Sequence, residues 1–314
     1  NLSIELFIDL MMSLNVINSI FIMKTITVFT PTFNRAYCLH QVYDSLVAQT
    51  NANFIWMVID DGSSDNTREL VAGWIAENKI EIHYIYQENQ GMHGAHNTAY
   101  QNITTELNTC IDSDDFMPND AIEKILKHWE QHKDDFDNIA GIIALDAYKD
   151  GKVIGQKIPE NLKTCTLIDL HQRYHIKGDK KVIYRTDIVK QFPLYPIFKA
   201  ERFVPLGSLY LLIDQHYKML PLNEVVCIVE YLADGSSRNI IKQYRKHPNG
   251  FLYGRKVRMK TALSFKERFK NAVHLVSSAI FAQKPLALFD QYWYINIVAI
   301  PFWIALNVYI RYKA

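Results

Sequence analysis

Cysteine is scarce in this chain, and its four cysteines are far apart, at Cys38, Cys110, Cys165 and Cys227. They form no CxxC pair, which argues against a zinc knuckle and against a disulfide framework. No GxGxxG follows the first expected strand and no GxxxxGK[ST] occurs, so the dinucleotide fingerprint is absent and a P-loop is excluded. His93 and His96 lie three residues apart but lack a third ligand, which makes a histidine metal site a weak hypothesis. A reducing cytoplasm fits this composition best.

The net charge of the chain is only +1, but positive and negative residues are unevenly distributed along the sequence. Residues 1–237 carry 20 Lys and Arg against 31 Asp and Glu, whereas residues 238–314 carry 14 against 2. An acidic body is a poor binder of nucleic acid, and no nucleic-acid partner is expected. A basic tail that is also aromatic and aliphatic favours an anionic membrane surface.

The first 23 residues are apolar, but they hold Glu5 and Asp9 and lack the basic start of a secretory signal. We therefore expect an extension of uncertain role at 1–23. A main domain is expected over 24–237, with two halves, 24–150 and 151–237. The remainder, 238–314, is expected to be a helical region that associates with a membrane.

Apolar runs and helical patterns alternate four times in the first half of the chain. Strands are expected at 25–30, 54–59, 80–86, 107–112 and 139–145, with helices between them at 34–49, 66–77, 91–101 and 119–132. This order predicts an α/β fold, with a mostly parallel sheet covered by helices on both faces. Beyond residue 150 the alternation breaks down, with a helix expected near 167–174 and a strand at 224–231.

Three carboxylates follow the fourth expected strand, in the sequence Asp112-Ser113-Asp114-Asp115. Close carboxylates repel one another unless a cation lies among them. Oxygen ligands of this kind suit Mg²⁺ or Mn²⁺, which often complete their shell with a substrate's phosphates. A nucleotide-diphosphate site follows as a hypothesis, with Asp114 as the best metal ligand. The alternative is an acidic helix N-terminus, capped by Asp114 or Asp115.

Two further polar clusters follow the first and second expected strands, at 32–35 and 60–65. Ligands bind beyond the carboxyl ends of the strands in such sheets, so all three clusters are expected at one edge. Asp60 or Asp61 could accept a hydrogen bond from a uracil ring or a ribose, and Asp112 could reach ribose hydroxyls.

The segment 291–310 has no charged residue in 20 positions and is rich in tyrosine and tryptophan. Its length would allow a membrane span, but Pro301, Asn296, Asn307 and the aromatic residues favour a helix that lies in the interface of the cytoplasmic leaflet. A helix packed on the protein body is the remaining alternative. The expected location is the cytoplasmic face of the cell membrane, with peripheral or monotopic attachment.

These motifs together resemble the family 2 inverting glycosyltransferases of the GT-A fold, over about 24–143. The first motif is Thr30-Pro31-Thr32-Phe33-Asn34-Arg35, the second is 59–65, and the third is the DxD-like 112–115. The resemblance implies a Rossmann-like GT-A sheet and a set of nucleotide-sugar contacts at Thr30, Pro31, Asn34, Arg35, Asp60, Asp61, Asp112 and Ser113. It implies a Mg²⁺ or Mn²⁺ ion on Asp114. It also implies that 24–237 is a catalytic domain with a nucleotide-sugar half (24–150) and an acceptor half (151–237).

One departure from the family pattern concerns the donor side. Where the family often reads Gly-x-x-x-Ala-Arg-Asn, this chain has His96 in place of the arginine. We treat His93 only as a wall of the donor site. By resemblance to related bacterial enzymes Glu201 is the candidate general base, with Asp214 in reserve; an ion pair of Glu201 with Arg202 or Lys199 is the alternative.

The function expected is metal-dependent transfer of a hexosyl or N-acetylhexosaminyl group from a nucleoside-diphosphate sugar to a lipid-linked or polysaccharide acceptor. The expected donor is a UDP-sugar. A sugar nucleotidyltransferase shares the carboxylate chemistry, but it would need a Gly-rich loop with Lys or Arg after the first strand. An inactive nucleotide-binding scaffold is the third alternative.

Overall fold

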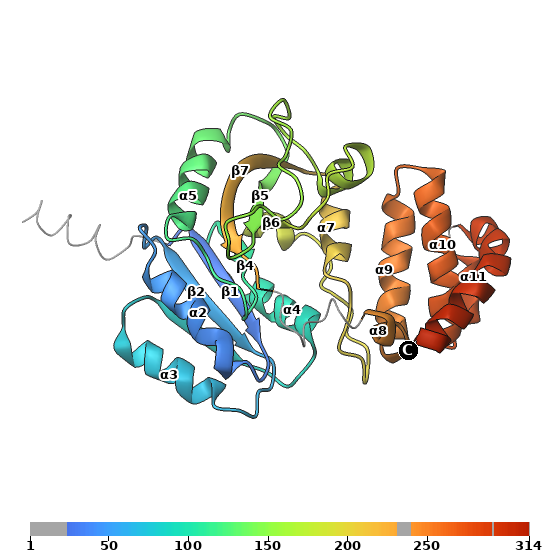
Figure 1. Ribbon diagram of the computed structural model, residues 1–314, viewed down its shortest axis with the longest axis horizontal. Helices are drawn as coiled ribbons and strands as arrows, with labels where there is room; N and C mark the ends of the chain where they lie inside the picture. The colour runs from blue at the N-terminus through green and yellow to red at the C-terminus, as the bar shows by residue number, and fades with distance from the viewer. Residues whose placement is uncertain (1–23, 231–239, 291, 314) are drawn as a thin grey trace, which may run out of the picture.

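The computed structural model describes residues 24–230, 240–290 and 292–313. The expected extension at 1–23 lies outside the described residues. Figure 1 shows an α/β body joined to a separate group of helices formed by the C-terminal part of the chain.

A seven-stranded sheet with the order β3-β2-β1-β4-β6-β5-β7 forms the centre of the body. Its strands are β1 (Ile26–Thr32), β2 (Phe54–Asp60), β3 (Ile82–Tyr86), β4 (Leu107–Cys110), β5 (Ile139–Ala147), β6 (Lys180–Arg185) and β7 (Lys218–Ile228). The first four strands pair in parallel, as the alternation of the sequence predicts. β6 is antiparallel to both of its neighbours, β4 and β5, while β5 and β7 are parallel. One sheet therefore runs through both expected halves of the catalytic domain.

Several element boundaries differ from the prediction, among them the end of β4 and the start of β7. β4 ends at Cys110, so the acidic residues from Asp112 onward belong to the following loop rather than to the strand. β7 begins at Lys218, six residues before the expected start, because Lys218 pairs with Ile139 and the ladder continues from there.

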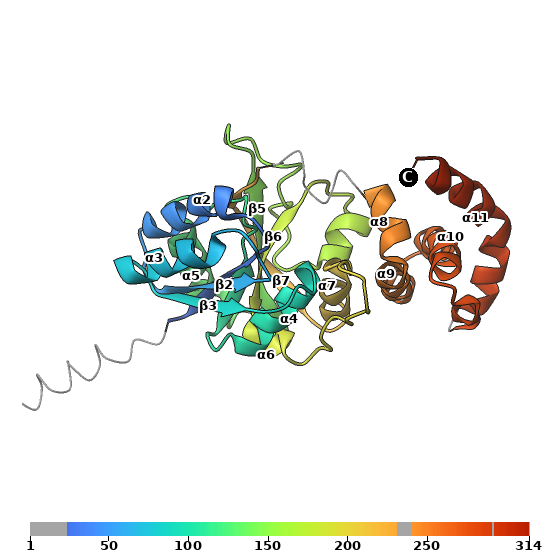
Figure 2. The same ribbon diagram turned by 90° about the horizontal axis from the view of Figure 1, so that it is seen from below.

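Helices cover both faces of the sheet. One apolar cluster joins its first face to α2 (Ala36–Val47), α3 (Thr67–Glu77) and α5 (Ala121–His132). A second cluster joins the other face to α4 (Met92–Asn102), α6 (Thr186–Val189) and α7 (Gly207–Ile213). Figure 2 shows the two layers on either side of the strands. The strands are apolar on both faces because both faces are covered.

The helix expected near 167–174 is present as a short π-helix, Asp169–Arg173. It leads through a loop into β6. This connection belongs to the part of the chain where the sequence pattern is weakest.

The C-terminal part is helical. It contains α8 (Ile240–Lys246), α9 (Pro248–Thr261), α10 (Phe265–Phe281), a 3₁₀ turn (Pro285–Phe289) and α11 (Trp293–Lys313). An apolar cluster from α9, α10 and α11 forms a core of its own, which includes Leu252, Leu275 and Ile295. Within the described ranges, no helix has the length and hydropathy that a membrane span requires.

Glu201 holds the start of α9. Its Oε1 accepts hydrogen bonds from the backbone N–H and the side-chain amide of Asn249, at 3.1 and 2.6 Å, and its Oε2 accepts one from the N–H of Gly250 at 2.9 Å. The first N–H groups of a helix have no partner within the helix, and a carboxylate satisfies them well. Glu201 therefore attaches the C-terminal helices to the catalytic body.

Asp214 is a buried carboxylate at the C-terminal end of α7. Its Oδ2 accepts a hydrogen bond from the N–H of Ile168 at 2.9 Å, while its Oδ1 is buried without a partner. Burial raises the pKa of Asp214 to about 7.

We predict that Asp214→Asn changes the pH dependence of stability. The folded protein binds this proton more tightly than the unfolded chain, whose Asp pKa is about 3.9. Protonated Asp214 therefore stabilises the folded state fully at low pH, and this stabilisation is lost as the pH rises through 7. From pH 5 to pH 8 the free energy of unfolding of the wild type should fall relative to Asp214→Asn, by on the order of 2 kcal/mol.

Urea unfolding at the two pH values measures this difference, with Asp44→Asn on the exposed side of α2 as the control. Parallel pH profiles for the wild type and Asp214→Asn would contradict the assignment.

Candidate functional site

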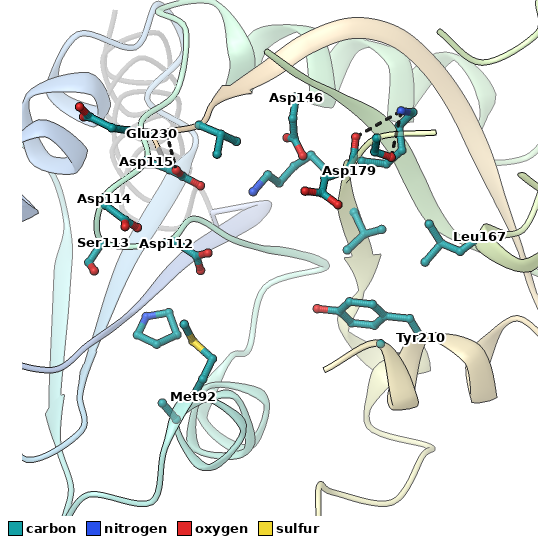
Figure 3. Close-up of a pocket in the computed structure, with 18 of the residues that line it drawn as sticks. Met92, Asp112, Ser113, Asp114, Asp115, Asp146, Leu167, Asp179, Tyr210 and Glu230 are labelled. Carbon is teal, nitrogen blue, oxygen red and sulfur yellow. Dashed lines mark hydrogen bonds between the residues drawn. The ribbon is translucent and has the colours of Figure 1, made fainter. Parts of the chain in front are cut away.

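A cavity of about 790 Å³ lies beyond the carboxyl ends of β1 and β4. One wall comes from the loops after β1, β2 and β4 and includes Pro31, Arg35, Asp61, Asp112, Ser113 and Asp114. The other wall comes from the end of β5, from residues 171–210 and from α9, and it includes Asp146, His171, Asp179, Lys181, Tyr210 and Arg258. Figure 3 shows Asp112 and Asp114 across the cavity from Tyr210 and Leu167.

The parallel register brings the polar loops together. Thr32 pairs with Asp60 across β1 and β2, and Phe29 pairs with Cys110 across β1 and β4. The loops that follow these strands therefore start at the same edge, as the sequence predicts.

The acidic turn after β4 is tied to its surroundings. The N–H of Asp115 donates to the carbonyl of Asp112 at 3.0 Å, which closes the turn. Asp115 is buried, and its Oδ1 accepts a hydrogen bond from the N–H of Glu230 at 3.1 Å. Burial, and then the neighbouring Asp112 charge, raise the pKa of Asp115. Asp114 points toward Arg35, whose Nη1 lies 3.8 Å from its Oδ2.

The carboxylate oxygens of the acidic turn suit a cation that also binds the substrate. In the parts of the chain that the structure describes, no three His, Cys, Asp or Glu side chains are arranged to hold a metal by themselves. Asp112 and Asp114 nevertheless face the cavity with carboxylate oxygens. Mg²⁺ is usually bound through one or two carboxylates, several waters and substrate phosphates, which is the arrangement that these side chains allow.

The loop after β2 is shaped by Asp60 and Asp61. Asp61 lines the cavity and accepts hydrogen bonds from the side chain of Gln87 and from the N–H groups of Gln90 and Gly91, at 2.6 to 2.8 Å. Burial raises the pKa of Asp61, and these bonds offset part of the shift. Asp60 lies outside the lining; it accepts from the hydroxyl of Tyr84 at 2.5 Å and from the N–H of Ser63 at 2.8 Å.

Asn34 and Thr30 are not among the residues that line the cavity. The side-chain oxygen of Asn34 accepts from the N–H of Ser64 at 2.8 Å, and this joins the loop after β1 to the loop after β2. Thr30 is buried, and its hydroxyl accepts from the indole N–H of Trp56 at 3.0 Å. The predicted role of these two residues as nucleotide contacts stays a prediction.

His93, His96 and Glu201 lie outside the cavity lining as well. His93 is 1% exposed, and neither ring nitrogen has a hydrogen-bond partner. Burial, with nearby His96 next, lowers the pKa of His93 to about 4. The structure thus brings six of the predicted residues together around the cavity: Pro31, Arg35, Asp61, Asp112, Ser113 and Asp114. The other five lie outside the lining: Thr30, Asn34, Asp60, His93 and Glu201.

Several residues of the second wall were not anticipated. Asp146 is 3% exposed at the end of β5, and its Oδ1 is buried without a hydrogen-bond partner. Burial raises the pKa of Asp146, and nearby Lys181 partly opposes the shift. Lys181 lies on β6 and donates to the carbonyl of Cys110 at 3.3 Å. The sequence signal that could have identified Asp146 as a site residue is its position as a carboxylate near the end of an otherwise apolar strand.

Comparisons with known proteins agree with this geometry. The family model described as "Glycosyl transferase family 2" matches residues 27–186. Glycosyltransferase GlyA of Streptococcus pneumoniae is 34% identical over 110 residues, which cover 35% of this chain and 16% of GlyA. An uncharacterized glycosyltransferase of Nostoc, alr2836, is 25% identical over 181 residues, or 55% of this chain and 54% of the relative. The chain thus spans at most about half the length of these relatives.

Two solved structures share the fold. Staphylococcus aureus TarS 1–349 in complex with UDP-GlcNAc aligns with a TM-score of 0.56 at 16% identity, over 92% of each chain. The mannosyltransferase PcManGT of Pyrobaculum calidifontis, in complex with GDP-Man and Mn²⁺, aligns with a TM-score of 0.55 at 16% identity, over 92% of this chain and 82% of the other. The strand-end site, the family match over half of the chain and the shared architecture lead to one conclusion: the chain belongs to the family 2 glycosyltransferases and has the GT-A fold.

Proposed function

We propose that this protein transfers a sugar from a nucleoside-diphosphate sugar to a hydroxyl of a lipid-linked or polysaccharide acceptor. The proposed donor is a UDP-sugar, and the proposed cofactor is Mg²⁺ or Mn²⁺. The observation that carries the proposal is the acidic turn 112–115, which presents Asp112 and Asp114 to a cavity at the carboxyl edge of the sheet. The nucleotides in the TarS and PcManGT complexes, and the Mn²⁺ of the latter, support the choice of ligands.

The two walls suit the two substrates. Asp61, Pro31 and Arg35 line the side where a base, ribose and diphosphate would bind, and Asp112 lies within the same wall. A divalent ion held by Asp114 would supply charge neutralisation for the departing diphosphate. The acceptor would enter from the side of Tyr210, opposite these residues.

Inverting transfer needs a base on the acceptor side. The acceptor oxygen bonds to the anomeric carbon, the bond from that carbon to the diphosphate breaks, and the electron pair leaves with the diphosphate. The acceptor's proton passes to a carboxylate within hydrogen-bond reach. Both oxygens of Glu201 are occupied by the start of α9, whereas Asp146 lines the cavity. We therefore assign the proton to Asp146 in preference to Glu201, the sequence-based candidate.

An inactive scaffold would bind nucleotide without turnover, so hydrolysis of the donor separates it from an enzyme. We predict that purified protein with Mn²⁺ releases UDP slowly from at least one UDP-sugar, and that Asp114→Ala lowers this rate at least about 100-fold through lost charge stabilisation.

Asp120→Ala, which removes an exposed carboxylate paired with Lys124, serves as the matched control and should hydrolyse the donor like the wild type. Equal rates for Asp114→Ala and Asp120→Ala would reject the assignment of Asp114.

The choice of base gives a second prediction. Asp146→Asn should bind UDP like the wild type and keep its melting temperature, because the change removes a buried charge without a hydrogen-bond partner on Oδ1. Its turnover should fall by about 10²- to 10⁴-fold.

Glu201→Gln provides the comparison. It should lower the melting temperature, because charge-assisted hydrogen bonds to α9 are lost, and folded molecules should keep most of their turnover. Loss of turnover in Glu201→Gln at an unchanged melting temperature would make Glu201 the base instead.

We also propose that α11 attaches the protein to the cytoplasmic face of an anionic membrane. One side of α11 packs on α10 through Ile295 and Ala299, and the other exposes Trp293, Tyr294, Val298 and Phe302, each more than half exposed. The excess of basic residues in 238–314 would add electrostatic attraction to such a surface.

Sedimentation with vesicles tests this attachment. Trp293→Ser combined with Val298→Ser should weaken binding to phosphatidylglycerol-containing vesicles about tenfold, because buried apolar area is lost. Ile75→Ser on α3, at the opposite end of the molecule, is the control. Binding that is equal for both variants, or absent in the wild type, would contradict the proposal.

A further inference from the structure

Helix α9 approaches the catalytic body unusually closely through one face. Gly250, Gly254 and Arg258 are spaced by four residues and therefore lie on the same side of the helix. A Cβ atom on Gly250 would lie 1.9 Å from the carbonyl oxygen of Phe203, and one on Gly254 would lie 2.8 Å from Cγ of Pro205. Only glycine permits this contact at Gly250, where the neighbouring atom belongs to the backbone.

The close contact, together with the hydrogen bonds from Glu201, fixes α9 against the segment 203–207. One turn beyond Gly254, the same face presents Arg258 to the start of α7. The Nη2 atom of Arg258 lies 3.9 Å from the position of a Cβ on Gly207. The helix therefore delivers a guanidinium group to the cavity wall.

Arg258 lines the cavity beside Gly207, Tyr210 and Leu211. More than a third of the surface of this residue is exposed. Desolvation in the wall, and then the charge of Arg255, lower the pKa of Arg258. Within the described part of the chain, no hydrogen bond or ion pair engages its side chain.

The neighbouring Arg255 provides a contrast on the same helix. Its guanidinium donates to the side-chain oxygen of Asn271 at 2.9 Å and to the hydroxyl of Tyr244. Arg255 thus serves the packing of the C-terminal helices, whereas Arg258 lines the cavity. A partly desolvated guanidinium gains most from a planar, two-oxygen anion, and phosphate is such a partner.

We propose that Arg258 forms a phosphate subsite on the acceptor side of the cavity, so that the acceptor carries a phosphate or diphosphate near the hydroxyl that receives the sugar. This inference rests on the proposed function. Arg258 lies beside Gly207 at the start of α7, and Figure 3 shows Tyr210 of the same helix across the cavity from Asp112 and Asp114. This placement favours the acceptor as the source of the phosphate over the donor's diphosphate. With such a subsite, α9 would belong to the substrate site and would also connect it to the helices proposed to face the membrane.

Two titrations by calorimetry test the subsite: UDP into the protein with Mg²⁺, and inorganic phosphate into the protein already saturated with UDP and Mg²⁺. The variants are Arg258→Ala, Arg258→Lys and the control Lys260→Ala, which removes one positive charge from an exposed position of the same helix. Melting temperatures confirm that each variant is folded.

We expect Arg258→Ala to bind phosphate at least about tenfold more weakly than the wild type and Lys260→Ala, with UDP affinity unchanged. Arg258→Lys should be intermediate, because it keeps the charge and loses the two-pronged geometry. A tenfold loss of UDP affinity confined to the Arg258 variants would assign the same subsite to the donor's diphosphate.

Equal phosphate and UDP binding by the wild type and Arg258→Ala would overturn the proposal, as would an equal effect of Lys260→Ala. If the wild type bound phosphate through Arg258 but bound no nucleotide with any metal, the proposed function would fail while the subsite stood. The two failures are therefore distinguishable.

Discussion

The mutual repulsion of carboxylates at one edge of the sheet is the constraint on which the rest of the site depends. The parallel pairing of β1 with β2 and β4 starts their following loops at a common edge, and this places Asp61, Asp112 and Asp114 around one cavity. Such a concentration of negative charge is unfavourable unless cations offset it. Arg35 and Lys181 supply part of the compensation from within the protein. A divalent ion with its bound diphosphate would supply the remainder, which links the electrostatics of the fold to its proposed chemistry.

The second wall of the cavity comes from parts of the chain that are distant in sequence. β5 contributes Asp146, the segment before β6 contributes Asp179, α7 contributes Tyr210, and α9 contributes Arg258. The C-terminal helices thus have two roles in this account. One face of α9 completes the site, and the exposed side of α11 faces the proposed membrane. A lipid-linked acceptor with a phosphate would suit both, because the same group of helices would contact the lipid surface and the phosphate.

The first half of the fold could be predicted from the sequence because its determinants are local. Apolar runs, the spacing of helices and the polar residues at strand ends predict the parallel direction of β1 to β4 and the location of the acidic turn. The antiparallel β6 was not predicted, because the chain before it has little periodic pattern. Glu201 could not be placed, since its partners Asn249 and Gly250 lie 48 and 49 residues further along the chain. Arg258 was grouped with the basic tail for the same reason: its contact with the cavity depends on the docking of α9, which no local spacing reveals.

A crystal structure of the protein with UDP and Mn²⁺ tests the central claim most directly. The account predicts one metal ion between a carboxylate oxygen of Asp114 and the diphosphate, with the uridine beside Asp61 on the same wall of the cavity. A diphosphate bound away from the acidic turn, or UDP bound at full affinity without a metal beside Asp114, would contradict it.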